Sequence, residues 1–182
     1  MAFIVAVSRS NRHGFTKQNE PTVRLLEGLG VEGDVHAGSK VQHRYSARKA
    51  RGAAPANQRQ LHLMEEELFE ELRGKGFNLF AGALGENITT RGIDLFSLPE
   101  YSRLHIGSEA IVELTGLRTP CRQMDKFAAG LAKAVMVAPA PGAKPMSRAG
   151  VMAVVVKGGE VRPGDKIETE LPAGSRKPLK HI

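Results

Sequence analysis

The sequence contains only one cysteine, Cys121, in 182 residues. A lone cysteine cannot form a disulfide within the chain, and it excludes a zinc site built from several thiolates. We therefore expect a free thiol, which suits a reducing compartment such as the cytoplasm.

Long apolar runs are also missing. No stretch approaches the roughly 18 apolar residues of a membrane-spanning helix. The apolar part of the first residues, "MAFIVAVSRSNRHG", is too short for a secretory signal. The hydrophobic fraction of 41% and the charged fraction of 25% are ordinary for a folded chain. These features predict one soluble, cytoplasmic domain with no membrane partner.

Aromatic residues make up only 5% of the chain, and tryptophan is absent. This disfavours the stacking surfaces of RNA-binding and single-strand-binding domains. Acidic residues are absent between Asp34 and Glu65, where basic residues gather: Lys40, Arg44, Arg48, Lys49, Arg51 and Arg59, with His36, His43 and His62. The net charge of +7 and this segment predict contact with an anion such as phosphate. A solvated basic loop and a nucleic-acid-binding module are the alternatives.

Short segments rich in β-branched and apolar residues predict strands at 3–10, 59–64 and 88–89. Two pairs of strands within 103–116 and 149–171, the second turning at Gly158–Gly159, and two helices within 65–76 and 125–136 complete the pattern. The glycine-rich and basic residues from 28 to 58 predict a long loop. Many short strands separated by turns predict a mainly β fold with short helices, closed or nearly closed as a β-barrel.

Two groups of charged residues are given no chemical role. Glu65, Glu66 and Glu67 crowd the start of the first predicted helix, where carboxylates interact well with the helix dipole. The basic tail, residues 172–182, is rich in Pro, Gly and Ser and is expected to be flexible. The predicted domain therefore covers residues 1–171.

Cys121 is the strongest candidate for chemistry. Arg118 and Arg122 flank it, Pro120 precedes it, and the second predicted helix begins just beyond it. Cations and a helix N-terminus both favour the thiolate form of a cysteine, which is its nucleophilic and metal-binding form. The alternative is a small buried apolar residue, which is the commonest role of a free cysteine.

Two further pairs of polar residues stand between glycines. Asp34 and His36 in "GDVHAG" could bind a metal or act as an acid–base pair, or they could cap a turn. Glu86 and Asn87 in "GENI" could bind a polar ligand or satisfy the backbone of the Gly85 turn.

Four segments in order, "GVEGDVHAG", "GALGENITTRGIDL", "RLHIGSEAIVELTGLRTPCRQM" and "RAGVMAVVVKGGEVRPGDKI", resemble the MOSC domain. This family comprises the C-terminal domain of molybdenum cofactor sulfurases and stand-alone bacterial proteins. The resemblance runs from about Val5 to Ile167, and Cys121 falls at the family's cysteine position.

The resemblance implies a MOSC-like β-barrel that binds the molybdenum cofactor, a pterin dithiolene carrying a phosphate. It places Asp34, His36, Glu86 and Asn87 beside the cofactor. Among the cations nearest these motifs, we infer that Arg59, Arg118 and Arg148 contact the cofactor, as does Arg122 beside the cysteine, because arginine offers a planar fork to phosphate oxygens.

Two functions fit the resemblance, and the sequence leaves both open. In the first, Cys121 ligates molybdenum in an enzyme that reduces N-hydroxylated compounds with electrons from a separate donor protein. In the second, Cys121 carries a persulfide and delivers sulfur to the cofactor or another metal-sulfur centre. This chain lacks the pyridoxal-phosphate domain of the fused sulfurases, so a carrier would need a separate sulfur donor. It also departs from the family at "LPEYSRLHIG", where we expect a proline-glycine turn.

Overall fold

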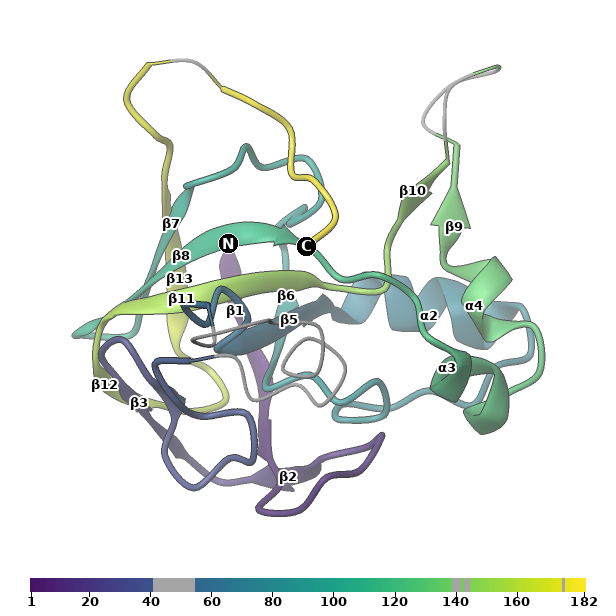
Figure 1. The fold of residues 1–182 in the computed structure, drawn as a ribbon, viewed down its shortest axis with the longest axis horizontal. Helices are drawn as coiled ribbons and strands as arrows, with labels where there is room; N and C mark the ends of the chain where they lie inside the picture. The colour runs from purple at the N-terminus through teal and green to yellow at the C-terminus, as the bar shows by residue number, and fades with distance from the viewer. Residues whose placement is uncertain (41–54, 139–141, 143–144, 175) are drawn as a thin grey trace.

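The computed structural model describes residues 1–40, 55–138, 142, 145–174 and 176–182. Its centre is a closed β-barrel, shown in Figure 1. Most of the basic segment predicted to contact an anion, residues 41–54, lies outside the described residues. The predictions for Arg44, Arg48, Lys49 and Arg51 therefore stay predictions.

Seven strands form the barrel in the described part of the chain. In spatial order they are β1 (Ala2–Arg9), β6 (Ile88–Arg91), β5 (Leu61–Glu65), β11 (Val151–Lys157), β8 (Ala110–Leu117), β7 (Arg103–Ile106) and β13 (Lys166–Glu170). The barrel closes because β13 pairs with both β7 and β1, with Ala2 opposite Ile167. All these pairs are antiparallel except β5 with β6. The expected mainly β barrel is confirmed.

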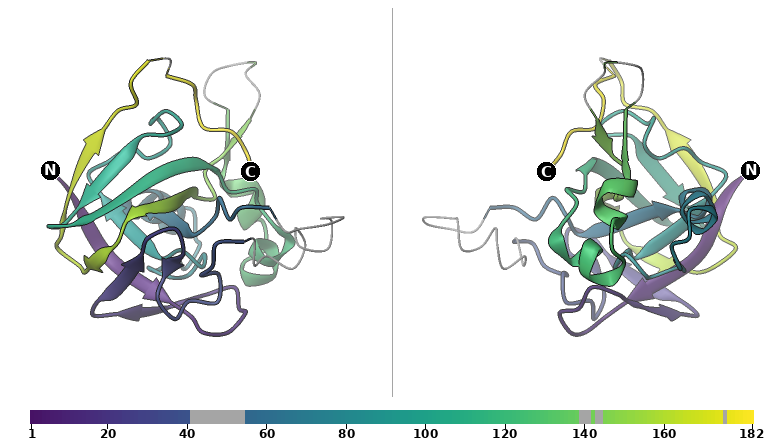
Figure 2. Two further views of the ribbon diagram at one scale, coloured as in Figure 1. Left: turned by 60° about the vertical axis from the view of Figure 1, so that its left-hand side comes forward. Right: turned by 90° about the vertical axis from the view of Figure 1, so that its right-hand side faces the viewer.

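Small elements surround the barrel. Figures 1 and 2 show the helices α3 and α4 and the hairpin of β9 and β10 standing together at one end of the molecule. The remaining elements are β2 (Gln18–Glu20), which extends the barrel sheet beside β1, β3 (Val23–Leu26), β4 (Gly30–Val31), α2 (Glu66–Gly74), α3 (Arg122–Phe127), α4 (Leu131–Ala134), β9 (Met136–Val137), β10 (Met146–Ser147) and β12 (Gly159–Val161).

The core follows from the two-residue period of the strands. On β7, Leu104 and Ile106 are fully buried, whereas Arg103 and His105 face outward. Strand β8 begins with the same alternation. Helix α2 adds the buried side chains Leu68, Phe69 and Leu72 to this core, as its spacing predicts.

Some predicted elements differ from the structure. The hairpin expected around Gly158–Gly159 is wrong, because β12 pairs with β3 in a separate small sheet instead of folding back onto β11. The single helix expected at 125–136 is two short helices, separated at Gly130, whose φ of 82° lies in the left-handed region. The long loop expected from residue 28 contains the short strand β4.

Residues 176–182 of the basic tail lie beside the barrel. The amide of Leu117 donates to the carbonyl of Lys180 (2.7 Å), and the amide of Ile182 donates to the carbonyl of Leu117 (3.2 Å). Leu179 is buried. The tail therefore lies along the end of β8, just before the cysteine segment.

None of the helices in the described ranges has the length and apolar character that crossing a membrane would require.

The carboxyl group of Glu65, at the end of β5, gives a test of the fold. Burial raises its pKa to about 7, even though Leu95 donates its amide to Oε1 (2.6 Å) and Arg148 lies nearby. Because folding raises this pKa, Glu65 favours the folded state most at pH values below its pKa in the unfolded chain. That contribution to stability is lost as pH rises through about 7.

We therefore expect Glu65→Gln, which cannot ionise, to gain stability relative to the wild type as pH rises from 5 to 8. The expected gain is about 2 to 3 kcal/mol, because each pKa unit corresponds to about 1.4 kcal/mol. Urea unfolding of both proteins across this pH range measures it. Parallel stability curves would contradict an elevated pKa at Glu65.

Candidate functional site

A cleft of about 900 Å³ opens where β8 ends and α3 begins. This volume lies within the range of roughly 300–1,000 Å³ that small-molecule sites span. Its lining comes from segments far apart in the sequence and includes these basic side chains: Lys17, Arg59, Arg118 and Arg122, with His13, His36 and His62. No aspartate or glutamate is among the described lining residues. The cleft is therefore suited to an anionic ligand.

Cys121 lies at this cleft, half-buried, as the N-cap residue of α3. The strand before it ends at Leu117, so the thiol stands in the predicted junction between strand and helix. Its Sγ lies 3.9 Å from Oε1 of Gln123, within its own segment. Because the thiol reaches the cleft from a rigid junction, it can meet a bound ligand.

Two arginines lie near the thiol. Nη1 of Arg118 donates to the carbonyl of Leu84 (2.7 Å), and its guanidinium lies 5.7 Å from the ring centre of Phe15. Burial lowers the pKa of Arg118 and of Arg59, and the negative charge of a Cys121 thiolate opposes this in both. Both guanidinium groups therefore lie close enough to Cys121 to interact with its charge.

Arg59 has an unsatisfied donor. Its Nε is buried and has no hydrogen-bond partner among the described residues. A buried guanidinium donor without an acceptor is costly, so an acceptor supplied by a ligand would stabilise this side chain. Arg122, the first residue of α3, is exposed at the same cleft.

Asp34 lies beneath the cleft and organises its polar side chains. One carboxylate oxygen accepts from Nζ of Lys17 (2.7 Å), Nδ2 of Asn87 (3.1 Å) and the amide of Ser10 (3.2 Å). The other accepts from the amide of His36 (2.9 Å) and lies 3.4 Å from Nδ1 of that ring. Of the predicted pair, Asp34 therefore supports the site and His36 lines it.

Asn87 joins two walls of the cleft. Its Nδ2 donates to the carbonyl of Ser8 (3.1 Å) as well as to Asp34, and its Oδ1 accepts the amide of His62 (3.2 Å). Burial lowers the pKa of His62 well below its ordinary value, so its imidazole is neutral. Asn87 is one of the residues that line the cleft.

Glu86 does not line the cleft. It is fully buried, and its carboxylate accepts the amides of Gly82 and Leu84 (3.1 Å to Leu84) and the hydroxyl of Thr89 (3.2 Å). Of the two interpretations of the sequence, satisfaction of the turn backbone is the one that the structure shows. Glu86 acts on the site through this turn, whose residue Gly85 is part of the lining.

Replacing Glu86 with alanine is therefore expected to destabilise the fold by about 3 kcal/mol, because several buried donors lose their acceptor. Urea unfolding measures this loss. The matched control is Glu160→Ala, at an exposed glutamate on β12, for which the expected change is within about 0.5 kcal/mol. Equal stability losses in the two variants would contradict the structural role of Glu86.

Arg148, which the sequence places near a cofactor, also lies outside the described lining of the cleft. Its Nη1 donates to Oε2 of Glu71 (2.8 Å), its Nη2 lies 3.8 Å from Oε2 of Glu65, and its guanidinium lies over the ring of Phe96. Glu71 thus compensates its charge, and Glu65 lies close to it. The structure brings six of the predicted residues to the cleft: His36, Arg59, Asn87, Arg118, Cys121 and Arg122.

Sequence reasoning missed Lys17 and gave His62 no role of its own. Lys17 is buried against Asp34, 17 positions along the chain. Burial lowers its pKa, and Asp34 opposes this. No local pattern marks either residue, because their partners come from distant segments of the chain.

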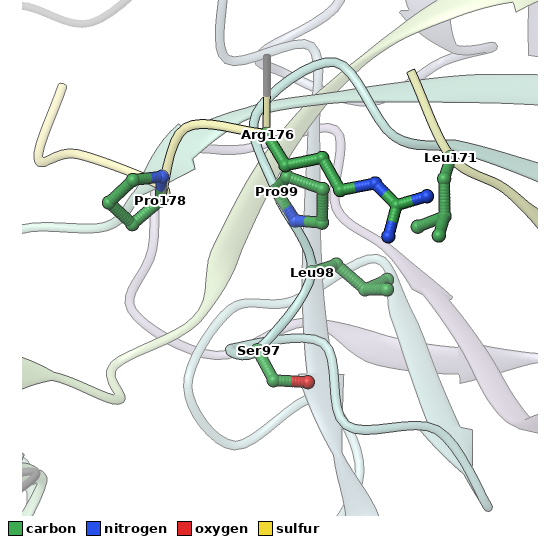
Figure 3. A pocket seen from close by; sticks show the side chains of 6 residues that line it. All are labelled: Ser97, Leu98, Pro99, Leu171, Arg176 and Pro178. Atoms are coloured by element: carbon green, nitrogen blue, oxygen red, sulfur yellow. The ribbon is translucent and has the colours of Figure 1, made fainter. Parts of the chain in front are cut away.

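A second, shallower pocket of about 390 Å³ lies where the tail meets the barrel. Figure 3 shows the side chain of Arg176 between Pro99 and Leu171. The pocket is lined by Ser97, Leu98, Pro99, Leu171, Arg176 and Pro178. These residues include neither a thiol nor an imidazole nor a carboxylate, so we assign no chemistry to them.

Among the described residues, no three His, Cys, Asp or Glu side chains come together as a set of metal ligands. Cys121 is thus a single candidate metal ligand within a group of cations.

The model of the MOSC domain family matches residues 31–168. No curated protein has a significant match to the sequence. The fold is similar to that of the YuaD protein from Bacillus subtilis, with a TM-score of 0.75, 24% identity and coverage of 92% of this chain and 94% of that one. It is also similar to YiiM from Geobacillus stearothermophilus, with a TM-score of 0.68, 17% identity and coverage of 98% and 80%. The fold is similar as well to that of YiiM from Escherichia coli, with a TM-score of 0.63, 18% identity and coverage of 97% of this chain and 73% of that one.

Proposed function

Because this chain belongs to the MOSC domain family, we propose that it binds the molybdenum cofactor in the cleft beside Cys121 and reduces N-hydroxylated compounds. The observation that carries the proposal is a cleft with several cations, one thiol and no carboxylate among its described lining residues. Cations suit the phosphate of this cofactor, and a thiolate suits its sulfur-rich metal centre.

The donor set supports this cofactor. Nε of Arg59 is buried and lacks an acceptor among the described residues, and phosphate oxygens would provide one. The guanidinium of Arg118 adds a second planar fork, while the exposed Arg122 adds charge at the start of α3. The thiolate of Cys121 is a soft ligand suited to molybdenum in a sulfur-rich setting.

The chemistry divides between the cofactor and the chain. When bound, the cofactor would supply a redox-active metal able to break the N–O bond of the substrate. In this proposal Arg59 and Arg118 hold the anionic end of the cofactor, Cys121 orients the metal, and Asn87 keeps the wall that contains His62 in place. The net reaction converts R–NH–OH, two electrons and two protons into R–NH₂ and water. A separate reduced flavoprotein would supply the electrons.

A sulfur carrier is the second candidate, because Cys121 is only half-buried and faces a cationic cleft. An accessible thiolate is the form of cysteine that accepts a sulfur atom as a persulfide. A persulfide formed there would pass its outer sulfur to a bound metal centre. This function needs a sulfur donor protein and no small substrate.

Turnover by the purified protein, with an N-hydroxylated base as substrate and chemically reduced flavin as electron donor, tests the proposal. We expect the amine and water as products when the protein comes from cells that make the molybdenum cofactor. The carrier predicts no turnover, and instead a mass increment of one sulfur on Cys121 after treatment with a sulfur donor. That pair of results would replace the first function with the second.

A further inference from the structure

We propose that His36 is the proton donor of this reductase, held in position by Asp34. The inference rests on the proposed function, because it names the group that protonates the oxygen leaving an N-hydroxylated substrate. The cofactor contacts proposed above involve Arg59, Arg118 and Cys121. His36 lines a part of the same cleft that these contacts do not use.

The imidazole of His36 lies at the cleft, and one of its two nitrogens faces Asp34. Nδ1 of His36 lies 3.4 Å from Oδ1 of Asp34, and the side chain of His36 is 33% exposed while that of Asp34 is 2% exposed. Since Nδ1 faces the carboxylate, Nε2 is the nitrogen available to a ligand. A buried carboxylate that orients one ring nitrogen leaves the other for proton transfer, which is the usual arrangement of catalytic histidines.

Asp34 is suited to this role because it stays ionised. Burial alone would raise its pKa, but the hydrogen bond with His36 and the charge of Lys17 lower it below the usual range. The carboxylate is also fixed in place by donors from three other segments, Ser10, Lys17 and Asn87. It therefore favours a proton on Nδ1, the ring nitrogen that faces it.

The surroundings of His36 leave room for proton exchange. The groups that face it among the described residues are Asp34, with Lys17 behind it, the ring of His13, and the side-chain amide of Asn57. His13 meets His36 edge to face, with ring centres 5.9 Å apart, and is exposed. Nδ2 of Asn57 donates to the backbone carbonyl of His36 (3.1 Å), so this contact holds the backbone and does not involve the ring.

The step balances within the net reaction. The N–O bond of R–NH–OH breaks with two electrons from the reduced flavoprotein, the imidazolium gives its proton to the oxygen that becomes water, and a second proton from solvent goes to nitrogen. His36 then regains a proton from water. General-acid catalysis of this kind contributes about 100- to 10,000-fold to a rate.

The test compares wild type, His36→Gln and the control His105→Gln, each purified from cells that make the cofactor. His105 lies on β7 and pairs with Glu170 (2.7 Å), outside the lining of the cleft. We expect His36→Gln to lower kcat at least about 100-fold, with KM and molybdenum content close to wild type, and His105→Gln to change none of these.

A second readout does not depend on turnover. Nitrogen NMR of the full-length protein above the titration range of histidine should show the His36 proton on Nδ1, facing Asp34. A proton on Nε2 would overturn the proposal. So would wild-type kcat in His36→Gln, with molybdenum and turnover present in both proteins, and this result would leave the reductase function standing. Absence of molybdenum and turnover from the wild type itself would instead remove the proposed function and the proton donor with it.

Discussion

Cys121→Ser is expected to lower turnover of N-hydroxylated substrates about 1,000-fold or more, the largest effect of any single substitution in this account. Serine keeps the size of the side chain, but its hydroxyl is not ionised at neutral pH and is a hard ligand, whereas the thiolate is soft. Binding and orientation by the rest of the cleft cannot restore a missing metal ligand.

The measurement is the initial rate with reduced flavin as electron donor, together with a thermal unfolding curve. Cys121 is half-buried and serine is close to it in size, so unfolding should change little. A variant that unfolds like the wild type and has lost turnover assigns the loss to the thiol. Turnover within a few-fold of wild type would contradict its role as a metal ligand.

The second large effect is expected at Arg118. Arg118→Met should weaken retention of the cofactor about 10- to 100-fold, because a hydrogen bond to a charged group contributes about 1.5 to 3 kcal/mol. Arg118→Lys should lie between wild type and Arg118→Met, since lysine keeps the charge and loses the planar fork. Pterin remaining on the protein after gel filtration at increasing dilution measures this retention.

Arg148→Met is the matched control for this experiment. Arg148 is paired with Glu71 and lies outside the described lining of the cleft, so its loss should leave pterin retention unchanged. An equal loss of pterin in Arg148→Met and Arg118→Met would show that overall positive charge, rather than the cleft, determines retention. That result would contradict the assignment of the site.

The position of Cys121 could be predicted because its causes are local. The end of β8 and the start of α3 follow from a change of residue type within a few positions, and the thiol lies between them. The same holds for α2, whose buried face repeats at helical spacing. Barrel closure is less local, yet the number of short strands and the turns between them indicated it.

The rest depends on partners distant in the sequence. Strand β12 pairs with β3, which lies more than a hundred residues earlier in the chain. The turn at Gly158–Gly159 alone therefore could not show whether β12 would pair with β11 or with another strand. The support of His36 has the same character, since the carboxylate of Asp34 is held by Lys17 and Asn87 from other segments. Arg148 was misleading for the converse reason: it stands at the start of a matched motif, but its side chain lies against Glu65 and Glu71 outside the cleft.

The content of molybdenum and pterin in natively purified protein tests the central claim most directly. The protein should be prepared, beside Cys121→Ser, from cells able to make the molybdenum cofactor. We expect nearly one molybdenum and one pterin per wild-type chain, and loss of molybdenum from Cys121→Ser. Wild-type protein that carries neither molybdenum nor pterin would contradict it.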